Sequence, residues 1–88
     1  MKLIIALLKD IDTELVTNTL VEAGFRVTRI ASIGGFLKRG LSTVMIGVEE
    51  PQIEAAINII REKVSPADDP GSHRATLFVL PVTEFTHM

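Results

Sequence analysis

The sequence predicts an α+β fold, with a four-stranded antiparallel sheet and two helices on one face. Two observations predict it. Four apolar segments with strand-like patterns are spread along the chain, and two segments with helical spacing of apolar residues lie between them. The resulting order, βαββαβ, most simply gives the ferredoxin-like arrangement. Because the chain has 88 residues and no clear internal repeat, we expect a single domain over residues 1–88.

The first half of the chain supplies the first strand, the first helix and the second strand. Residues 2–8 are almost continuously apolar, which is typical of a buried strand. From Asp10 the apolar residues fall at helical spacing; Asp10 or Asp12 can cap the start of this helix, and Gly24 can end it. Residues 25–32 then alternate between apolar and polar, which indicates a strand with one face in water.

The second half repeats the pattern of strand, helix and strand. Residues 42–48 predict a strand that forms a hairpin with the preceding one. Pro51, which follows two glutamates, suits the first turn of a helix over residues 50–64. Residues 65–73 form a polar connector with Pro and Gly, and residues 74–82 predict the last strand.

The first and last strands carry more apolar surface than this fold can cover. Residues 3–8 and 76–82 are apolar at successive positions, so both faces of these strands require burial. Two helices cover only one face of the sheet. We therefore expect a homo-oligomer in which the uncovered face lines the subunit interface.

Composition and charge exclude several classes of protein. With 47% hydrophobic residues and no cysteine, the chain is neither disordered nor equipped for thiolate chemistry. The apolar run LIIALL is too short for a signal-peptide core or a membrane span, so a soluble cytoplasmic protein without membrane association is expected. The net charge of −2 argues against a dedicated nucleic-acid-binding protein.

One basic segment stands out in this acidic chain. No acidic residue occurs between Glu22 and Glu49, whereas four cations do: Arg26, Arg29, Lys38 and Arg39. These cations are either an ordinary solvated surface or a local site for capture of an anion. The segment contains the stretch ASIGGFLKRG at residues 31–40, which raises the second possibility.

The residue types around this stretch suit an anionic ligand with a ring. Gly34 and Gly35 can adopt positive φ and bring backbone N–H groups close to a phosphate. Arg26 and Thr28 lie two residues apart, so the guanidinium and the hydroxyl share one strand face and can converge on one ligand group. Phe36 and Leu37 can pack against a purine ring, and Gly47 leaves a gap where a base can lie.

Each of these features also has a purely structural interpretation. The glycine pair can be an ordinary hairpin turn, Phe36 and Leu37 can cover a subunit seam, and Gly47 can form a β-bulge. Phe78 is expected in the core, and His87 in the tail at the end of the chain. The sequence shows no convincing set of metal ligands and no nucleophile–base pair, so neither a metal, a cofactor nor catalysis is predicted.

Taken together, four stretches resemble the cyclic-di-AMP receptor proteins of the PII-like superfamily: KLIIAL, VEAGFRVTRIASIGGFLKRG, STVMIGVEE and ATLFVLPVTEF. The most specific element is F-R-x-T followed at short range by G-G-F-L. The resemblance implies a PII-like homotrimer that binds one cyclic-di-AMP at each subunit cleft and signals to a downstream protein not identified by the sequence. The ligand-binding residues that it implies are Arg26, Val27, Thr28, Gly35, Phe36, Leu37, Gly47, Phe78 and His87, with Gly34 beside them.

The chain departs from the family pattern at two places. Leu41 stands where the family usually has an Asn that hydrogen-bonds the ligand, and the segment at residues 64–73 is short. Other functions therefore stay open: a PII-like sensor of another anionic nucleotide such as ATP or ADP, or a protein-interaction module without nucleotide. A small phosphate-hydrolysing enzyme of the same fold is least favoured, because Asn18 and Asn58 both fall on predicted helices.

Overall fold

A computed structural model describes residues 1–30, 41–66 and 74–83 of the chain. The order of its elements confirms the predicted α+β fold with ferredoxin-like topology. The strands are β1 (Lys2–Lys9), β2 (Arg26–Ile30), β3 (Leu41–Val48) and β4 (Ala75–Pro81). The helices are α1 (Asp10–Glu22) and α2 (Ile53–Lys63), and a short 3-10 helix, η1 (Glu50–Gln52), leads into α2.

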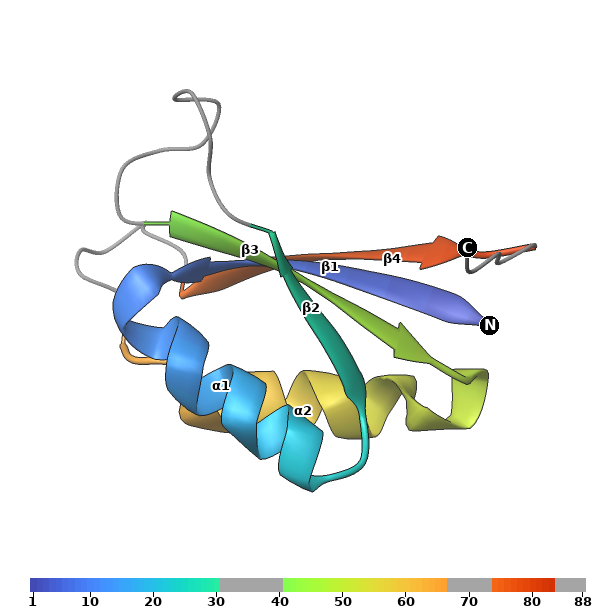
Figure 1. Cartoon of the computed structure of the whole chain (residues 1–88), viewed down its shortest axis with the longest axis horizontal. Coiled ribbons are helices and arrows are strands. Elements are labelled where there is room, and N and C mark those ends of the chain that lie inside the picture. Colours follow the sequence, from blue (N-terminus) through green and yellow to red (C-terminus); the bar gives the residue numbers. More distant parts are fainter. Residues whose placement is uncertain (31–40, 67–73, 84–88) are drawn as a thin grey trace.

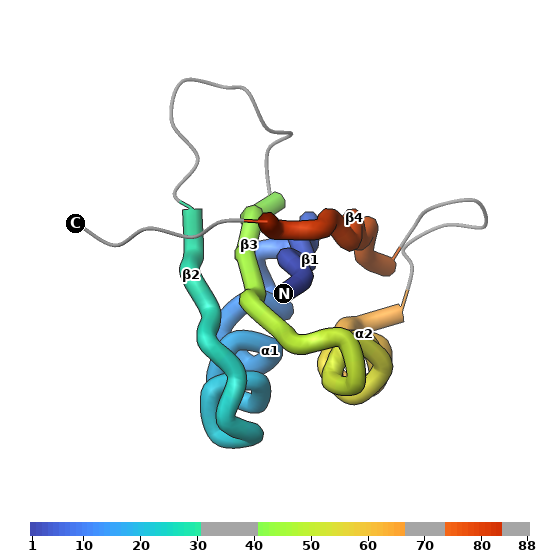
Figure 2. Tube along the Cα trace, turned by 90° about the vertical axis from the view of Figure 1, so that its right-hand side faces the viewer, coloured from blue at the N-terminus to red at the C-terminus, as the bar shows by residue number. Residues whose placement is uncertain are grey.

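The four strands form one antiparallel sheet in the order β2-β3-β1-β4. Both helices pack side by side on the same face of this sheet (Figures 1 and 2). The sheet therefore has a covered face, toward the helices, and an open face, away from them. The prediction of two helices on one face is confirmed.

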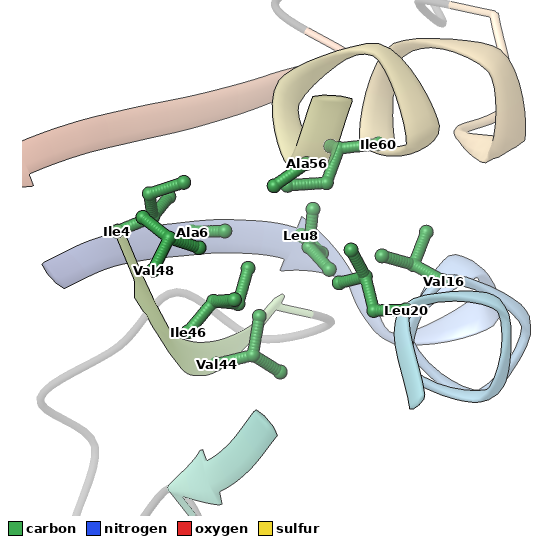
Figure 3. Packing of buried hydrophobic residues seen from close by; sticks show 10 residues of the cluster. All are labelled: Ile4, Ala6, Leu8, Val16, Leu20, Val44, Ile46, Val48, Ala56 and Ile60. Atoms are coloured by element: carbon green, nitrogen blue, oxygen red, sulfur yellow. The ribbon is translucent and has the colours of Figure 1, made fainter. Parts of the chain in front are cut away.

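The core lies between the covered face and the two helices (Figure 3). The pairing of β1 with β3 sets Ile4 beside Ile46 and Ala6 beside Val44, so alternate residues of both strands point toward the helices. The buried apolar side chains come from four elements: Ile4, Ala6 and Leu8 of β1, Val44, Ile46 and Val48 of β3, Val16 and Leu20 of α1, and Ala56 and Ile60 of α2. The buried residues recur at every second position in the strands and at helical spacing in the helices, and together they form this single cluster.

The start of α1 differs from the prediction. Lys9 occupies the N-cap position, and no side chain caps the helix, so the expectation that Asp10 or Asp12 does so is wrong. Both carboxylates are engaged elsewhere. Asp10 accepts a hydrogen bond from the hydroxyl of Ser42, and the buried Asp12 accepts bonds from the Ser65 backbone N–H, at 3.1 Å, and hydroxyl, at 3.0 Å.

The other helix ends agree with the sequence. Gly24 follows α1 with a φ of 94°, a conformation that favours glycine. Pro51 lies in the first turn of η1, and the Glu49 N–H there donates to the Gln52 side-chain oxygen at 3.0 Å. Among the described residues, no helix has the length and the apolar character required to cross a membrane.

The open face carries apolar side chains that the chain itself leaves partly in water. The Phe78 side chain is 51% exposed, and Leu80 beyond it is also exposed. The expectation that Phe78 is a core residue is therefore wrong, because the register of β4 turns this side chain away from the helices. Leu3, Ile5 and Leu7 of β1 are half-buried on the same face.

Candidate functional site

The register of the sheet decides which side chains share the open face. At one end of the hairpin, Arg26 of β2 pairs with Gly47 of β3, and Thr28 pairs with Met45. Gly47 pairs in turn with Leu3 of β1. Because side chains alternate between faces along a strand, these residues all belong to the open face. Arg26 and Thr28 thus lie on one face, as the sequence predicts.

A cavity of about 290 Å³ lies at this end of the open face. Its walls come from β1, β2 and β3 and from the residue that follows β4. The lining residues are Met1, Lys2, Leu3, Arg26, Thr28, Met45, Gly47 and Val82. Three of the predicted site residues, Arg26, Thr28 and Gly47, are therefore brought together.

Gly47 makes room in this cavity because it has no side chain. A Cβ atom at this position would lie 3.1 Å from the Cε atom of Met1, so the methionine lies over the glycine. The pairing of Gly47 with Leu3 continues the regular register of β1 and β3 on both sides, so the alternative of a β-bulge is wrong. Gly24, and not Gly47, is the described glycine that has positive φ.

The cavity combines one cation with an apolar floor. Within residues 1–30, 41–66 and 74–83, the Arg26 guanidinium has no hydrogen-bond or ion-pair partner. Leu3 and Met45 supply apolar surface beside it, whereas Lys2 pairs with Val48 and so belongs by alternation to the covered face. Such a site suits a ligand with an anionic group and a flat apolar part, because the cation attracts the first and the floor accommodates the second.

Three other predicted residues are described but lie apart from the cavity. The Val27 side chain points to the covered face and packs against the core. Leu41 lies six residues from Gly47 at the opposite end of β3, about 20 Å away. Phe78 lies on the open face, but three strand spacings separate it from Thr28, about 14 Å.

The remaining predicted residues, Gly34, Gly35, Phe36, Leu37 and His87, lie outside the described residues. Sequence reasoning missed five residues that line the cavity: Met1, Lys2, Leu3, Met45 and Val82. No local pattern points to Lys2 or Val82. Their place follows from the pairing of β1 with its neighbours and from the Val82 N–H, which donates to the Met1 carbonyl at 3.0 Å. In the described part of the chain, no group of His, Asp and Glu side chains has the arrangement of a metal site.

The chain is similar to known proteins in two comparisons. Residues 1–69 match a family model described as cyclic-di-AMP receptor, and the matched region includes Arg26, Thr28 and Gly47. The chain is also similar to a protein of unknown function from Pediococcus pentosaceus, whose crystal structure is solved. The identity is 30% over 99% of this chain and 96% of that chain, with a TM-score of 0.80.

Proposed function

Because the chain belongs to the cyclic-di-AMP receptor family, we propose that it is a signalling protein whose ligand is cyclic-di-AMP. The observation that carries the proposal is the convergence of Arg26 and Thr28 on a cavity whose floor is opened by Gly47. A guanidinium and a hydroxyl on one strand face suit a phosphate, and charge-assisted hydrogen bonds of this kind contribute about 1.5–3 kcal/mol each.

We assign complementary roles to the other lining residues. In this proposal Leu3 and Met45 contact an adenine ring. At about 290 Å³ the cavity lies at the lower end of the volumes of small-molecule sites, about 300–1,000 Å³. It therefore suits one half of a cyclic dinucleotide, and the second half requires further surface.

A neighbouring subunit of a homotrimer supplies that surface in this proposal. The apolar open face favours association, since Phe78 and Leu80 are exposed on it. Phe78 is too distant from Thr28 to share a ligand half within one chain, so we assign it to the cleft formed with the next subunit. Gly34, Gly35, Phe36, Leu37, Leu41 and His87 stay predicted contributors.

The same cavity is compatible with a second ligand class. A sensor of ATP or ADP would use the same cation, so Arg26 does not distinguish it from a cyclic-di-AMP receptor. A protein-interaction module without nucleotide would leave Arg26 without a ligand role. We propose a non-enzymatic role, a cytoplasmic location and a downstream protein partner, in keeping with the receptor family.

Calorimetric titration with cyclic-di-AMP and with ATP tests the proposal. We expect wild type to bind cyclic-di-AMP and Arg26→Ala to weaken binding at least tenfold, which corresponds to about 1.4 kcal/mol. Arg29→Ala is the matched control, because it removes the same charge from the opposite face of the same strand. Leu41 is too distant from the cavity to act within one chain, so we assign it, like Phe78, to the cleft with the next subunit. There Leu41→Asn, which restores the amide usual in the family, is expected to strengthen binding.

Three results would decide against parts of this proposal. If neither nucleotide binds wild type at millimolar concentration, the receptor function is wrong. If ATP alone binds, the sensor of another nucleotide replaces it. Equal losses in Arg26→Ala and Arg29→Ala would show that net charge, and not the cavity, attracts the ligand.

A further inference from the structure

Helix α1 carries large apolar side chains on the side that faces away from the sheet. Ile11 is 79% exposed, Leu15 is 53% exposed and Val21 is 54% exposed. Ile11 and Leu15 are four residues apart and therefore adjacent along the helix surface. We define the α1 outer face by these three residues and their exposed polar neighbours, Glu14, Asn18 and Glu22.

Helix α2 shows that exposure of this kind is not a general property of the helical layer. It packs on the same face of the sheet (Figure 2), yet it contributes none of the large exposed apolar side chains of the described residues. Its exposed positions hold alanine, asparagine and charged residues: Glu54, Ala55, Asn58, Arg61, Glu62 and Lys63. The exposed apolar surface of the helical layer is therefore concentrated on α1, where solvation alone does not account for it.

The charge of α1 is one-sided. Its sequence, DIDTELVTNTLVE, contains four acidic residues and no lysine or arginine. Asp10 is bonded to Ser42 and Asp12 is buried against Ser65, which leaves Glu14 beside Ile11 and Glu22 beside Val21. The preceding Lys9 ammonium is engaged by the Pro66 carbonyl at 2.9 Å. Exposed apolar side chains with acidic neighbours are complementary to a surface with apolar residues and cations.

We propose that the α1 outer face is a docking surface for a cationic amphipathic helix of a partner protein. One helical turn of apolar contact, made by Ile11 and Leu15 with the Glu14 carboxylate alongside, fits one face of a helix that has Leu or Ile at i and i+4 and Lys or Arg beside them. The contact is small, so the complex is expected to be weak and salt-dependent.

Two other occupants fit the surface less well. A second copy that presents the same face would bring Glu14 and Glu22 against each other, which like-charge repulsion opposes. An anionic lipid surface repels the same carboxylates. The open face of the sheet lies on the other side of the molecule (Figure 1), so docking on α1 neither uses nor blocks the candidate ligand site.

The test uses a fluorescent 14-residue peptide of leucine and lysine with its leucines on one helical face. We expect the full chain to bind this peptide with micromolar affinity in fluorescence anisotropy and to lose affinity as salt is raised. Leu15→Ser and Glu14→Lys are each expected to weaken binding at least fivefold. Glu54→Lys, the same charge reversal on α2, is the matched control and is expected to leave most of the affinity intact.

Controls make each outcome decisive. The substituted side chains are exposed, so circular dichroism is expected to show unchanged folding. The proposal is overturned if the peptide does not bind, if a leucine–glutamate peptide binds equally well, or if Glu54→Lys weakens binding as much as Glu14→Lys. A change in the mass of the assembly in Leu15→Ser would instead show that the α1 outer face contacts another copy. Because none of these measurements includes a nucleotide, their failure is distinct from failure of the receptor function.

Discussion

Replacement of Gly47 by valine is expected to stabilise the fold and weaken the ligand site at the same time. Gly47 lies near the end of the regular strand β3, without positive φ, so its backbone accepts any residue. A glycine inside a strand costs about 0.5–1 kcal/mol relative to alanine, and β-branched residues favour strands further. Valine therefore favours the strand conformation at position 47 more than glycine does.

The neighbours of Gly47 determine the size of each effect. A Cβ atom there would lie 3.1 Å from Met1 Cε, which is close. That atom is the far end of a flexible side chain that is 47% exposed, so a shift of a few tenths of an ångström relieves the contact at little cost. We expect a net gain of about 0.5–1 kcal/mol, which raises Tm by about 2–8 °C for a domain of this size.

The ligand site is expected to respond in the opposite direction. The valine side chain and the displaced methionine both enter the cavity of about 290 Å³ between Arg26 and Leu3. Loss of that space removes the surface on which a base would lie, so the affinity for cyclic-di-AMP is expected to fall at least tenfold.

Two measurements on the same sample check this prediction, a thermal melt of the ligand-free protein and a calorimetric titration. Thr43→Val serves as the matched control, since it places valine on the same face of the same strand, four residues and about 14 Å from Gly47. If Gly47→Val lowers Tm, or binds the nucleotide as tightly as wild type, the role given to this glycine is wrong.

Three further substitutions probe the core, a buried carboxylate and the open face. Leu8→Ala is expected to lower the free energy of unfolding by about 2–5 kcal/mol in urea titration, because Leu8 is fully buried, and a loss below about 1 kcal/mol would contradict the packing. Asp12→Ala leaves the Ser65 N–H without its acceptor and is expected to cost about 1.5–3 kcal/mol by the same assay. Asp10→Ala, at an exposed position, is expected to lower the free energy of unfolding by less than Asp12→Ala does. Equal losses in the two variants would show that the buried bonds of Asp12 to Ser65 are not the source of its effect. Phe78→Glu is expected to dissociate the proposed trimer in light scattering, whereas a monomeric wild type would refute association through the open face.

The sequence predicts local features of this molecule better than long-range ones. The alternation in β3 and the helical spacing in α2 predict both elements and their buried sides, because each period is a property of neighbouring residues. The same alternation predicts that Arg26 and Thr28 share a face. The pairing of β1 with β3 depends on contacts between residues 32 to 46 positions apart. The same pairing brings Leu3 to the cavity beside Gly47, so no local pattern predicts it.

Two wrong expectations have the same origin. Phe78 lies in a strand that is apolar at every position except Thr76, so alternation does not tell which side faces the helices, and the register with Ile5 decides it. Asp12 lies in the first turn of α1, but its carboxylate accepts a hydrogen bond from Ser65, 53 positions away. In both cases a residue distant in the sequence, Ile5 or Ser65, decides what the local pattern leaves open.

The first turn of α1 holds both of its aspartates against distant parts of the chain, and this gives it a mechanical role. Asp10 is bonded to Ser42 at the start of β3, and Asp12 to Ser65 just after α2. The start of β3 and the segment after α2 are thus hydrogen-bonded to the same helical turn. Neither segment can shift without breaking its hydrogen bond or rotating the first turn of α1. Because Ile11 lies between the two aspartates and points outward, any such rotation would also redirect the most exposed apolar side chain of the helix.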